Sequence, residues 1–264
     1  MIEIYPVLFE YGSLRIDTYS VVWFVALMLA ISWALRRLRI YGIDEDEARS
    51  VMAWSFVFML LGARAPEYFQ NFRVYMSNPK LFLDLNRGSL HEIGAILGAV
   101  LSALIMCVVK NLRGKNISFV RMCDVAIIPA FAAIAIGRWG CFLNGCCFGL
   151  VSSSFFAVHF PFDSVDVTRH PTQIYYSLFA CVNVLILLLV ERKLLAGKNS
   201  RSVSIIAPLG ILLYCLMRFV IGFFRVMNPF YTSFAHVAIC SGAFISVIWL
   251  GISLRKFSGK VGAK

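Results

Sequence analysis

Apolar residues run through this chain in seven stretches, separated by shorter connections that hold most of the charged residues. The stretches cover residues 21–35, 51–63, 93–109, 125–136, 174–190, 203–221 and 234–254. A simple membrane span needs about 20 residues, so the second and fourth stretches must borrow flanking residues. That brings Arg64 and Arg138 to the membrane surface or inside it. The pattern predicts an all-α integral membrane protein with seven transmembrane helices.

Composition supports this prediction. The chain is 60% hydrophobic with a mean hydropathy of +0.79, whereas soluble domains are about 45–50% apolar. Apolar stretches recur along the whole length without a long polar segment, which favours one polytopic membrane domain over residues 1–264. Residues 1–14 carry no lysine or arginine and so lack the basic start of a cleavable signal peptide.

Lysine and arginine predict the orientation. Four connections together hold 16 of the 25 basic residues, as the positive-inside rule expects of cytoplasmic segments. The C-terminus is therefore expected in the cytoplasm and the N-terminus outside, and the net charge of +11 indicates topology rather than nucleic-acid binding. The two long outward connections, residues 66–90 and 142–169, are expected to form outer-face arms. The first resembles an amphipathic element at the interface, and the second alternates at residues 155–160 like a short strand.

The minority set of basic residues on the outward side is almost entirely arginine. Four of these arginines, Arg64, Arg138, Arg218 and Arg225, lie in or beside apolar stretches, where an unpaired cation is costly. A guanidinium grips phosphate in two places, so an anionic ligand is one explanation and snorkelling to lipid headgroups is the other. Arg218 and Arg225 are seven residues apart, which on a continuous helix places both on one face.

Two further segments carry candidate chemistry. His91 beside Glu92 opens the third apolar stretch and is either a general base or part of an ordinary helix N-terminus. Pro171 near the start of the fifth stretch fits the first turn of a helix. Gln173 and Tyr175 then bring polar groups to its outer end, while His170 is a ligand-site residue or an interface cap.

Three of the eight cysteines, Cys141, Cys146 and Cys147, cluster in a glycine-rich segment that also holds Arg138. A zinc site would want a fourth ligand and a Cys-x-x-Cys spacing, and neither is present, so no metal is predicted. A disulfide on an oxidising outer face, thiols made reactive by the nearby arginine, and simple packing remain open.

Several blocks of the sequence resemble the bacterial prolipoprotein diacylglyceryl transferases. Three occur in the family's order: Gly137-Arg138-x-Gly140-x-Phe142-x-Asn144-Gly145, Arg169-His170-Pro171-Thr172-Gln173-x-Tyr175 and Arg218-Phe219-x-x-x-Phe223-Phe224-Arg225. Earlier blocks are matched by Tyr19, Gly62-x-Arg64, Asn78-Pro79 and Gly88-x-x-x-His91. The resemblance covers nearly the whole chain.

The resemblance implies seven transmembrane helices, an outside N-terminus and a multi-pass location in the bacterial inner membrane with the active site towards the outer leaflet. It implies transfer of the diacylglyceryl group of phosphatidylglycerol to the lipobox cysteine in a prolipoprotein signal peptide, releasing glycerol phosphate. The implied partners are these two substrates and membrane lipids, without nucleic acid or a cofactor. The implied catalytic residues are His91, Arg138 and Arg218. The implied substrate-binding residues are Tyr19, Arg64, Arg138, Asn144, Gly149, His170, Gln173, Tyr175, Arg218 and Arg225.

The chain also departs from the usual family pattern. The family usually has asparagine at Cys141, glutamate at Cys146, Tyr176 and Gly222, and a glycine pair at Glu92 and Ile93, and this chain is closer to a cysteine-bearing variant of the signature. Three alternatives stay open: a paralogue with another acceptor, an enzyme using one of its own clustered thiols as nucleophile, and a lipid-binding or transport protein without chemistry.

Overall fold

The protein is described from a computed structural model covering residues 6–11, 14–82, 91–160, 163, 165–196, 204–225 and 229–262. The chain forms two compact units. The first comprises Met1–Arg37 and Cys123–Lys264, and the second comprises Leu38–Met122. Each is described by itself.

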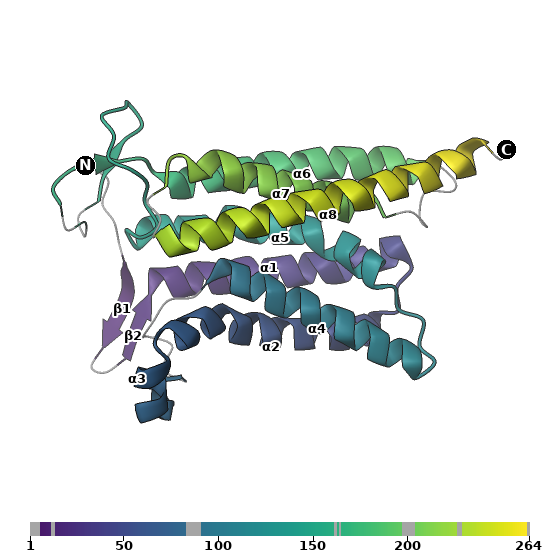
Figure 1. The fold of residues 1–264 in the computed structure, drawn as a ribbon, viewed down its shortest axis with the longest axis horizontal. Coiled ribbons are helices and arrows are strands. Elements are labelled where there is room, and N and C mark those ends of the chain that lie inside the picture. Colours follow the sequence, from purple (N-terminus) through teal and green to yellow (C-terminus); the bar gives the residue numbers. More distant parts are fainter. Residues whose placement is uncertain are drawn as a thin grey trace. The chain divides into compact units, whose positions relative to one another are not determined.

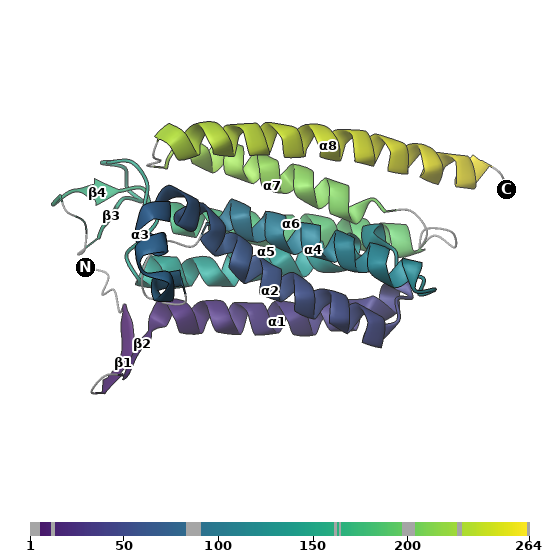
Figure 2. The same cartoon turned by 60° about the horizontal axis from the view of Figure 1, so that its bottom comes forward.

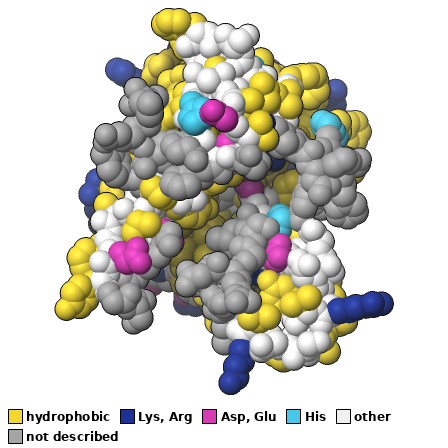
Figure 3. All heavy atoms as spheres, turned by 90° about the vertical axis from the view of Figure 1, so that its left-hand side faces the viewer, with side chains coloured by type: hydrophobic (Ala, Val, Ile, Leu, Met, Phe, Trp, Pro, Cys, Tyr) yellow, Lys and Arg dark blue, Asp and Glu magenta, His cyan; other side chains and the backbone are white. Residues whose placement is uncertain are grey.

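The first unit is a bundle of long helices (Figures 1 and 2): α1 (Thr18–Tyr41), whose residues to Arg37 belong here, α5 (Phe119–Leu143) from Cys123 onward, α6 (Thr172–Ala196), α7 (Ile206–Gly222) and α8 (Pro229–Gly262). Two small antiparallel ribbons lie at one end of these helices. One pairs β1 (Val7–Tyr11) with β2 (Leu14–Asp17), and the other pairs β3 (Val158–His159) with β4 (Thr168–Arg169). The short strand expected within residues 155–160 is confirmed as β3. Figure 3 is a view onto this end, where histidine and carboxylate side chains are exposed among hydrophobic ones.

Glycines allow α5 to pack closely on α1. A Cβ atom at Gly137 would lie 2.7 Å from the Trp23 ring, and one at Gly140 would lie 3.2 Å from the Tyr19 carbonyl oxygen. Gly137 and Gly140 would weaken an isolated helix, but the close packing they allow keeps α5 helical to Leu143. Arg138 is therefore part of the helix and is carried into the bundle.

A buried ion pair connects the other end of these helices. The Arg37 guanidinium donates two hydrogen bonds to the Glu191 carboxylate, of 2.8 and 2.7 Å, and further bonds to the carbonyl oxygens of Val125 and Asp124. The Asp124 carboxylate in turn accepts a 2.6 Å bond from the Ala207 amide at the start of α7. The network joins α1, α5, α6 and α7.

The second unit is built around a crossing of two helices, α2 (Glu45–Gln70) and α4 (Glu92–Leu112), with α3 (Phe72–Ser77) and the short 3-10 helix η1 (Pro79–Phe82) following α2. Cβ atoms at Gly62, Gly94 and Gly98 would all lie within 2.3 Å of a carbonyl oxygen on the facing helix. Small residues let helix backbones approach in this way within membranes.

Charged groups connect the other ends of the two helices. Glu47 of α2 forms ion pairs with Lys110 of α4 and with Lys115 beyond it. Hydrogen bonds from these two lysines lower the pKa of Glu47 to about 2.

Each of the seven predicted apolar stretches corresponds to a helix. Five helices are long and apolar enough to cross a membrane: α1, α4, α5, α6 and the His236–Phe257 part of α8. α7 is apolar but has 17 residues, and α2 includes Arg64, Pro66 and Glu67. Crossing by all seven helices, the orientation of the termini and the single membrane domain stay predictions. Part of the predicted arm, residues 83–90 with Gly88, lies outside the described residues.

Candidate active site

Three arginines of the first unit converge on the ring of Tyr176, in the first turns of α6. The guanidinium carbons of Arg138, Arg218 and Arg225 lie 4.1, 5.6 and 5.9 Å from the ring centroid. Arg218 Nη1 also donates a 2.8 Å hydrogen bond to the Tyr176 hydroxyl oxygen. Arg138, Arg218 and Tyr176 are all more than nine-tenths buried. Three positive charges around one ring, two of them on buried side chains, form a strong binding site for an anion.

The prediction that Arg218 and Arg225 share the face of one helix is wrong. Helix α7 ends at Gly222, and the chain then turns, with the Phe224 amide bonding to the Ile221 carbonyl. Arg225 forms an isolated antiparallel bridge with Gly149. The arginines still meet at Tyr176 because the turn and this bridge bring Arg225 back towards α6.

Gly149 lies where the segment after α5 crosses the end of α7. Its amide donates a 2.8 Å bond to the His170 carbonyl, and the next amide, of Leu150, bonds to the Phe224 carbonyl at the same distance. A Cβ at Gly149 would lie 2.1 Å from that Phe224 oxygen. Glycine is therefore required here by the close approach of two backbone segments.

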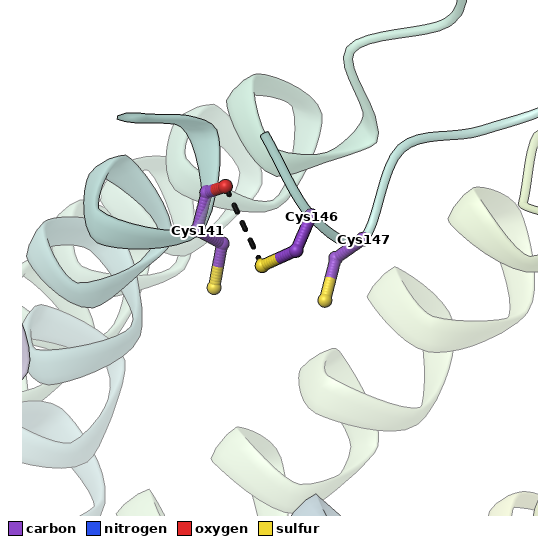
Figure 4. A group of neighbouring side chains, drawn as sticks. All are labelled: Cys141, Cys146 and Cys147. Atoms are coloured by element: carbon purple, nitrogen blue, oxygen red, sulfur yellow. Dashed lines mark hydrogen bonds between the residues drawn. The ribbon is translucent and has the colours of Figure 1, made fainter. Parts of the chain in front are cut away.

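The three clustered cysteines converge on one point. Cys141 lies in the last turn of α5, while Cys146 and Cys147 follow the turn after it, and Figure 4 shows the three sulfur atoms directed into a common space. Their Sγ atoms all lie within 4.8 Å of one another. Neighbouring residues usually direct their side chains apart, but Cys147 has a φ of 63°. This left-handed conformation costs an L-residue about 1–2 kcal/mol.

Hydrogen bonds from the start of α6 hold this segment in place. The Thr172 hydroxyl donates a 2.7 Å bond to the Cys147 carbonyl, and the Gln173 side-chain amide donates to the Cys146 carbonyl. The Cys146 amide donates to the Cys141 carbonyl. Two neighbouring α6 residues thus fix the backbone of two neighbouring cysteines, which places the thiols.

Cations and thiols interact at this site. Hydrogen bonds from the Cys141 and Cys146 thiols, followed by the Arg225 and Arg138 guanidiniums, lower the pKa of the Cys147 thiol. Arg138 therefore acts on the thiols and also contacts Tyr176. The arginine cluster and the thiol cluster are adjacent parts of one site.

The other predicted residues of the first unit lie around it. The phenol of Tyr19, at the start of α1, interacts electrostatically with all three thiols and with Arg138. Asn144 follows α5 and bonds to Cys146. His170 Nδ1 lies 3.0 Å from the Tyr175 hydroxyl. The buried Oε1 atom of Gln173 has no hydrogen-bond partner among the described residues, so it is available to a ligand hydroxyl or amine.

Two predicted residues, His91 and Arg64, belong to the second unit. His91 is the N-cap of α4, and Glu92 lies in the first turn, where the helix dipole favours a carboxylate. The carboxylate that faces the imidazole is Glu67 of α2, with Oε2 3.7 Å from His91 Nε2. The His91 amide also donates a 2.9 Å bond to the Ala63 carbonyl, next to the buried Arg64.

Tyr176 was not predicted from the sequence as a site residue. It stands where the resembling family usually has glutamate, and its hydroxyl accepts a hydrogen bond from Arg218 as a carboxylate would. Its position directly after the Arg169–Tyr175 block could have indicated a role in the site. A tyrosine in an apolar helix is, however, ordinarily a core residue.

Comparisons with known proteins identify the family of this chain. Residues 6–255 match the family described as Prolipoprotein diacylglyceryl transferase. A protein of Clostridium novyi (strain NT) named phosphatidylglycerol–prolipoprotein diacylglyceryl transferase is 34% identical over 223 residues, covering 82% of each chain. Proteins of the same name from Clostridium tetani (strain Massachusetts / E88) and Idiomarina loihiensis (strain ATCC BAA-735 / DSM 15497 / L2-TR) are 30% and 28% identical. Both cover 83% of this chain, and 85% and 80% of their own length. With these matches over most of its length, its apolar helices and its buried arginine cluster, the chain belongs to the prolipoprotein diacylglyceryl transferase family, a family of membrane transferases.

Proposed function

We propose that this protein transfers the diacylglyceryl group of phosphatidylglycerol to the cysteine thiol of a prolipoprotein lipobox and releases glycerol phosphate. The observation that carries the proposal is the convergence of Arg138, Arg218 and Arg225 on Tyr176. A phosphatidylglycerol headgroup brings one negative charge to this cluster, and its departure as glycerol phosphate creates a second. Fixed guanidiniums in a water-poor site stabilise that developing charge without reorganising.

Each group has a place in this scheme. Arg138 and Arg218 hold the phosphate and Arg225 adds to the positive field. Gln173 Oε1 accepts a hydrogen bond from a headgroup hydroxyl. Tyr19, Asn144, Gly149, His170 and Tyr175 line the lipid site, and Arg64 has the supporting role that the family resemblance implies. The family resemblance implies His91 as the base that removes the thiol proton, and Glu67, whose Oε2 lies 3.7 Å from His91 Nε2, would orient its imidazole.

The membrane arrangement is part of the proposal. Seven spans with the N-terminus outside and the C-terminus in the cytoplasm would put the arginine cluster near the outer leaflet of the bacterial cytoplasmic membrane. The bias of lysine and arginine towards four connections supports this orientation. Arginine substitutions in those connections provide controls remote from the lipid site.

The test uses the purified full-length protein in vesicles that contain labelled phosphatidylglycerol, with a lipobox peptide as acceptor. Thioether-linked peptide and glycerol phosphate in equal amounts are the expected products. Arg138→Gln and Arg218→Gln should each lower kcat by about 100-fold or more, the usual cost of removing one donor to a developing anion. Arg39→Gln is the matched control, because the Arg39 side chain is 85% exposed.

Three results would count against the proposal. Lipid that is bound but unchanged would identify a binding protein. Transfer to water or to another thiol, but never to the peptide, would identify a different acceptor. Full activity of Arg138→Gln or Arg218→Gln would remove the phosphate role from that arginine.

A further inference from the structure

We propose that Cys141, Cys146 and Cys147 are the three protein ligands of a zinc site whose fourth position receives the thiol of the acceptor cysteine. The inference rests on the proposed function, because a thiol acceptor gives the fourth position its occupant. It also answers the objection from sequence that a fourth ligand is missing. Catalytic zinc sites have three protein ligands and keep one position open for a reactant.

The distances suit such a site. Zinc binds thiolate sulfur at about 2.3 Å in tetrahedral geometry, so its ligand sulfurs lie about 3.8 Å apart. The three sulfurs lie within 4.8 Å of one another, and closing the difference requires each to move by less than about 1 Å, within the reach of a small χ1 rotation. The described part of the chain contains no other group of three cysteine, histidine or acidic side chains this close together.

The convergence of the three sulfurs requires an energetically unfavourable backbone conformation at Cys147. The left-handed φ of Cys147 lets two consecutive residues direct their sulfurs to one point. Hydrogen bonds from Thr172 and Gln173 to the carbonyls of Cys147 and Cys146 hold that backbone. Packing alone needs no such arrangement, and a disulfide would use two of the sulfurs and leave the third. Three convergent thiol ligands whose backbone is held in place by neighbouring hydrogen bonds are typical of a metal site.

The charges also balance. Three thiolates and one Zn²⁺ ion carry a net charge of −1, which becomes −2 when a substrate thiolate is added. Arg138 and Arg225 both act electrostatically on Cys147 and compensate this charge. Because the same arginines contact the Tyr176 ring, a thiolate on the metal would lie beside a phosphate held by the cluster.

The chemistry follows from metal-bound thiols being deprotonated outright. The acceptor thiol binds as thiolate and its proton passes to a base or to water. The sulfur electron pair then attacks the carbon of the diacylglyceryl group that is bonded to the phosphate ester oxygen and forms the C–S bond. The C–O bond to phosphate breaks, and its electron pair leaves with the oxygen as glycerol phosphate. The overall change is a substitution in which nothing is oxidised or reduced.

Metal binding is tested without lipid, on reduced, metal-free, full-length protein titrated with Zn²⁺ or with Co²⁺ as a spectroscopic probe. We expect about one ion per chain and an intense thiolate-to-cobalt absorption band. Binding should fall to background in Cys141→Ser, Cys146→Ser and Cys147→Ser, and should be unchanged in Cys240→Ser, because Cys240 is exposed on α8. No binding, or binding that survives all three substitutions, overturns the zinc site.

A second measurement uses only the wild-type protein, so its result does not depend on whether the cysteine variants fold. Zinc should protect the three clustered cysteines from alkylation, while the extent of alkylation of Cys181 and Cys240, which lie outside the cluster, should be the same with and without zinc. Equal alkylation of the cluster with and without zinc overturns the site. So does a disulfide within the cluster of protein isolated from membranes without reductant, because it would leave at most one thiolate for the metal.

The fourth position is tested by adding a lipobox peptide to the cobalt form. The cysteine peptide should change the absorption band and the matched serine peptide should not; an unchanged band overturns thiol coordination. If thioether forms at full rate in metal-free protein, the proposed function stands and the zinc inference fails. If zinc and the peptide thiol bind but no thioether forms, the zinc site stands and the transfer reaction fails.

Discussion

Tyr176→Phe removes one hydroxyl from the centre of the arginine cluster and leaves the ring in place. The hydroxyl accepts a 2.8 Å hydrogen bond from Arg218, and both side chains are buried. A hydrogen bond to a charged group contributes about 1.5–3 kcal/mol, and about 1.4 kcal/mol corresponds to a factor of ten. If this bond orients Arg218 towards the leaving phosphate, kcat should fall by about 10- to 150-fold.

Tyr176→Leu extends the same test to the ring. Cation–π contacts contribute about 0.5–2 kcal/mol each, and the guanidinium carbon of Arg138, at 4.1 Å, is the closest of the three. Losing the ring should therefore lower kcat by about a further 10-fold. Tyr11→Phe is the matched control, because Tyr11 on β1 is 78% exposed.

The assay measures thioether formation from labelled phosphatidylglycerol and a lipobox peptide, with thermal unfolding midpoints recorded for every variant. A positioning role requires kcat to fall while the KM for the peptide and the unfolding midpoint stay close to wild type. Wild-type kcat in Tyr176→Phe would refute the orienting hydrogen bond. Equal activity of the Phe and Leu variants would refute the contribution of the ring.

Three further predictions concern other parts of the fold. Gly149→Ala places a Cβ 2.1 Å from the Phe224 carbonyl oxygen and should lower both activity and the thermal unfolding midpoint. Gly222→Ala is the control, because a Cβ at Gly222 would meet nothing within 4 Å, and it should change the midpoint little. Equal midpoints for the two variants would contradict the close approach of the backbone at Gly149 to Phe224. Glu191→Gln leaves the buried Arg37 guanidinium without its carboxylate and should lower the free energy of unfolding by about 3–5 kcal/mol, measured by denaturant titration in detergent; a change below about 1 kcal/mol would refute the role of this pair. Glu47 has a pKa lowered from 4.5 to about 2, so its stabilising effect is present above pH 4.5 and is lost as the pH falls towards 2. The unfolding midpoint of Glu47→Gln should therefore lie below that of wild type at pH 7 and converge with it near pH 2, and a gap of constant size would contradict this assignment.

Several elements of the fold could be predicted from the sequence because they depend on local pattern. The apolar stretches are long and separated by charged residues, so a helix was correctly predicted for each of the seven stretches, although most of these helices were predicted too short. Helix α5 shows why. A run of glycines with an arginine reads as a helix end, whereas Gly137 and Gly140 are tolerated within the helix because they pack against Trp23 and Tyr19 of α1.

The candidate site was only partly predictable. Arginines beside apolar stretches stand out because burying a cation is expensive, and so Arg138, Arg218 and Arg225 were selected. The meeting point of these arginines at Tyr176 could not be predicted, because it depends on the chain leaving α7 at Gly222 and turning back. Likewise, Glu67 is 24 positions from His91 in sequence, and only the packing of α2 on α4 makes it the carboxylate that faces the imidazole.

By itself, the sequence determined the apolar, helical character of the chain and, through its motifs, its family, since these depend on composition and on residues close together along the chain. Only the tertiary structure decided that three arginines share one ring and that three cysteines share one space. The arginine grouping joins α5, α6, α7 and the turn after α7, which are far apart in sequence. The cysteine grouping depends on one left-handed residue and on hydrogen bonds from α6 to backbone carbonyls. Local propensities do not encode such long-range contacts, because the free energy that holds Cys147 in its unfavourable conformation comes from α6, 25 residues further along the chain.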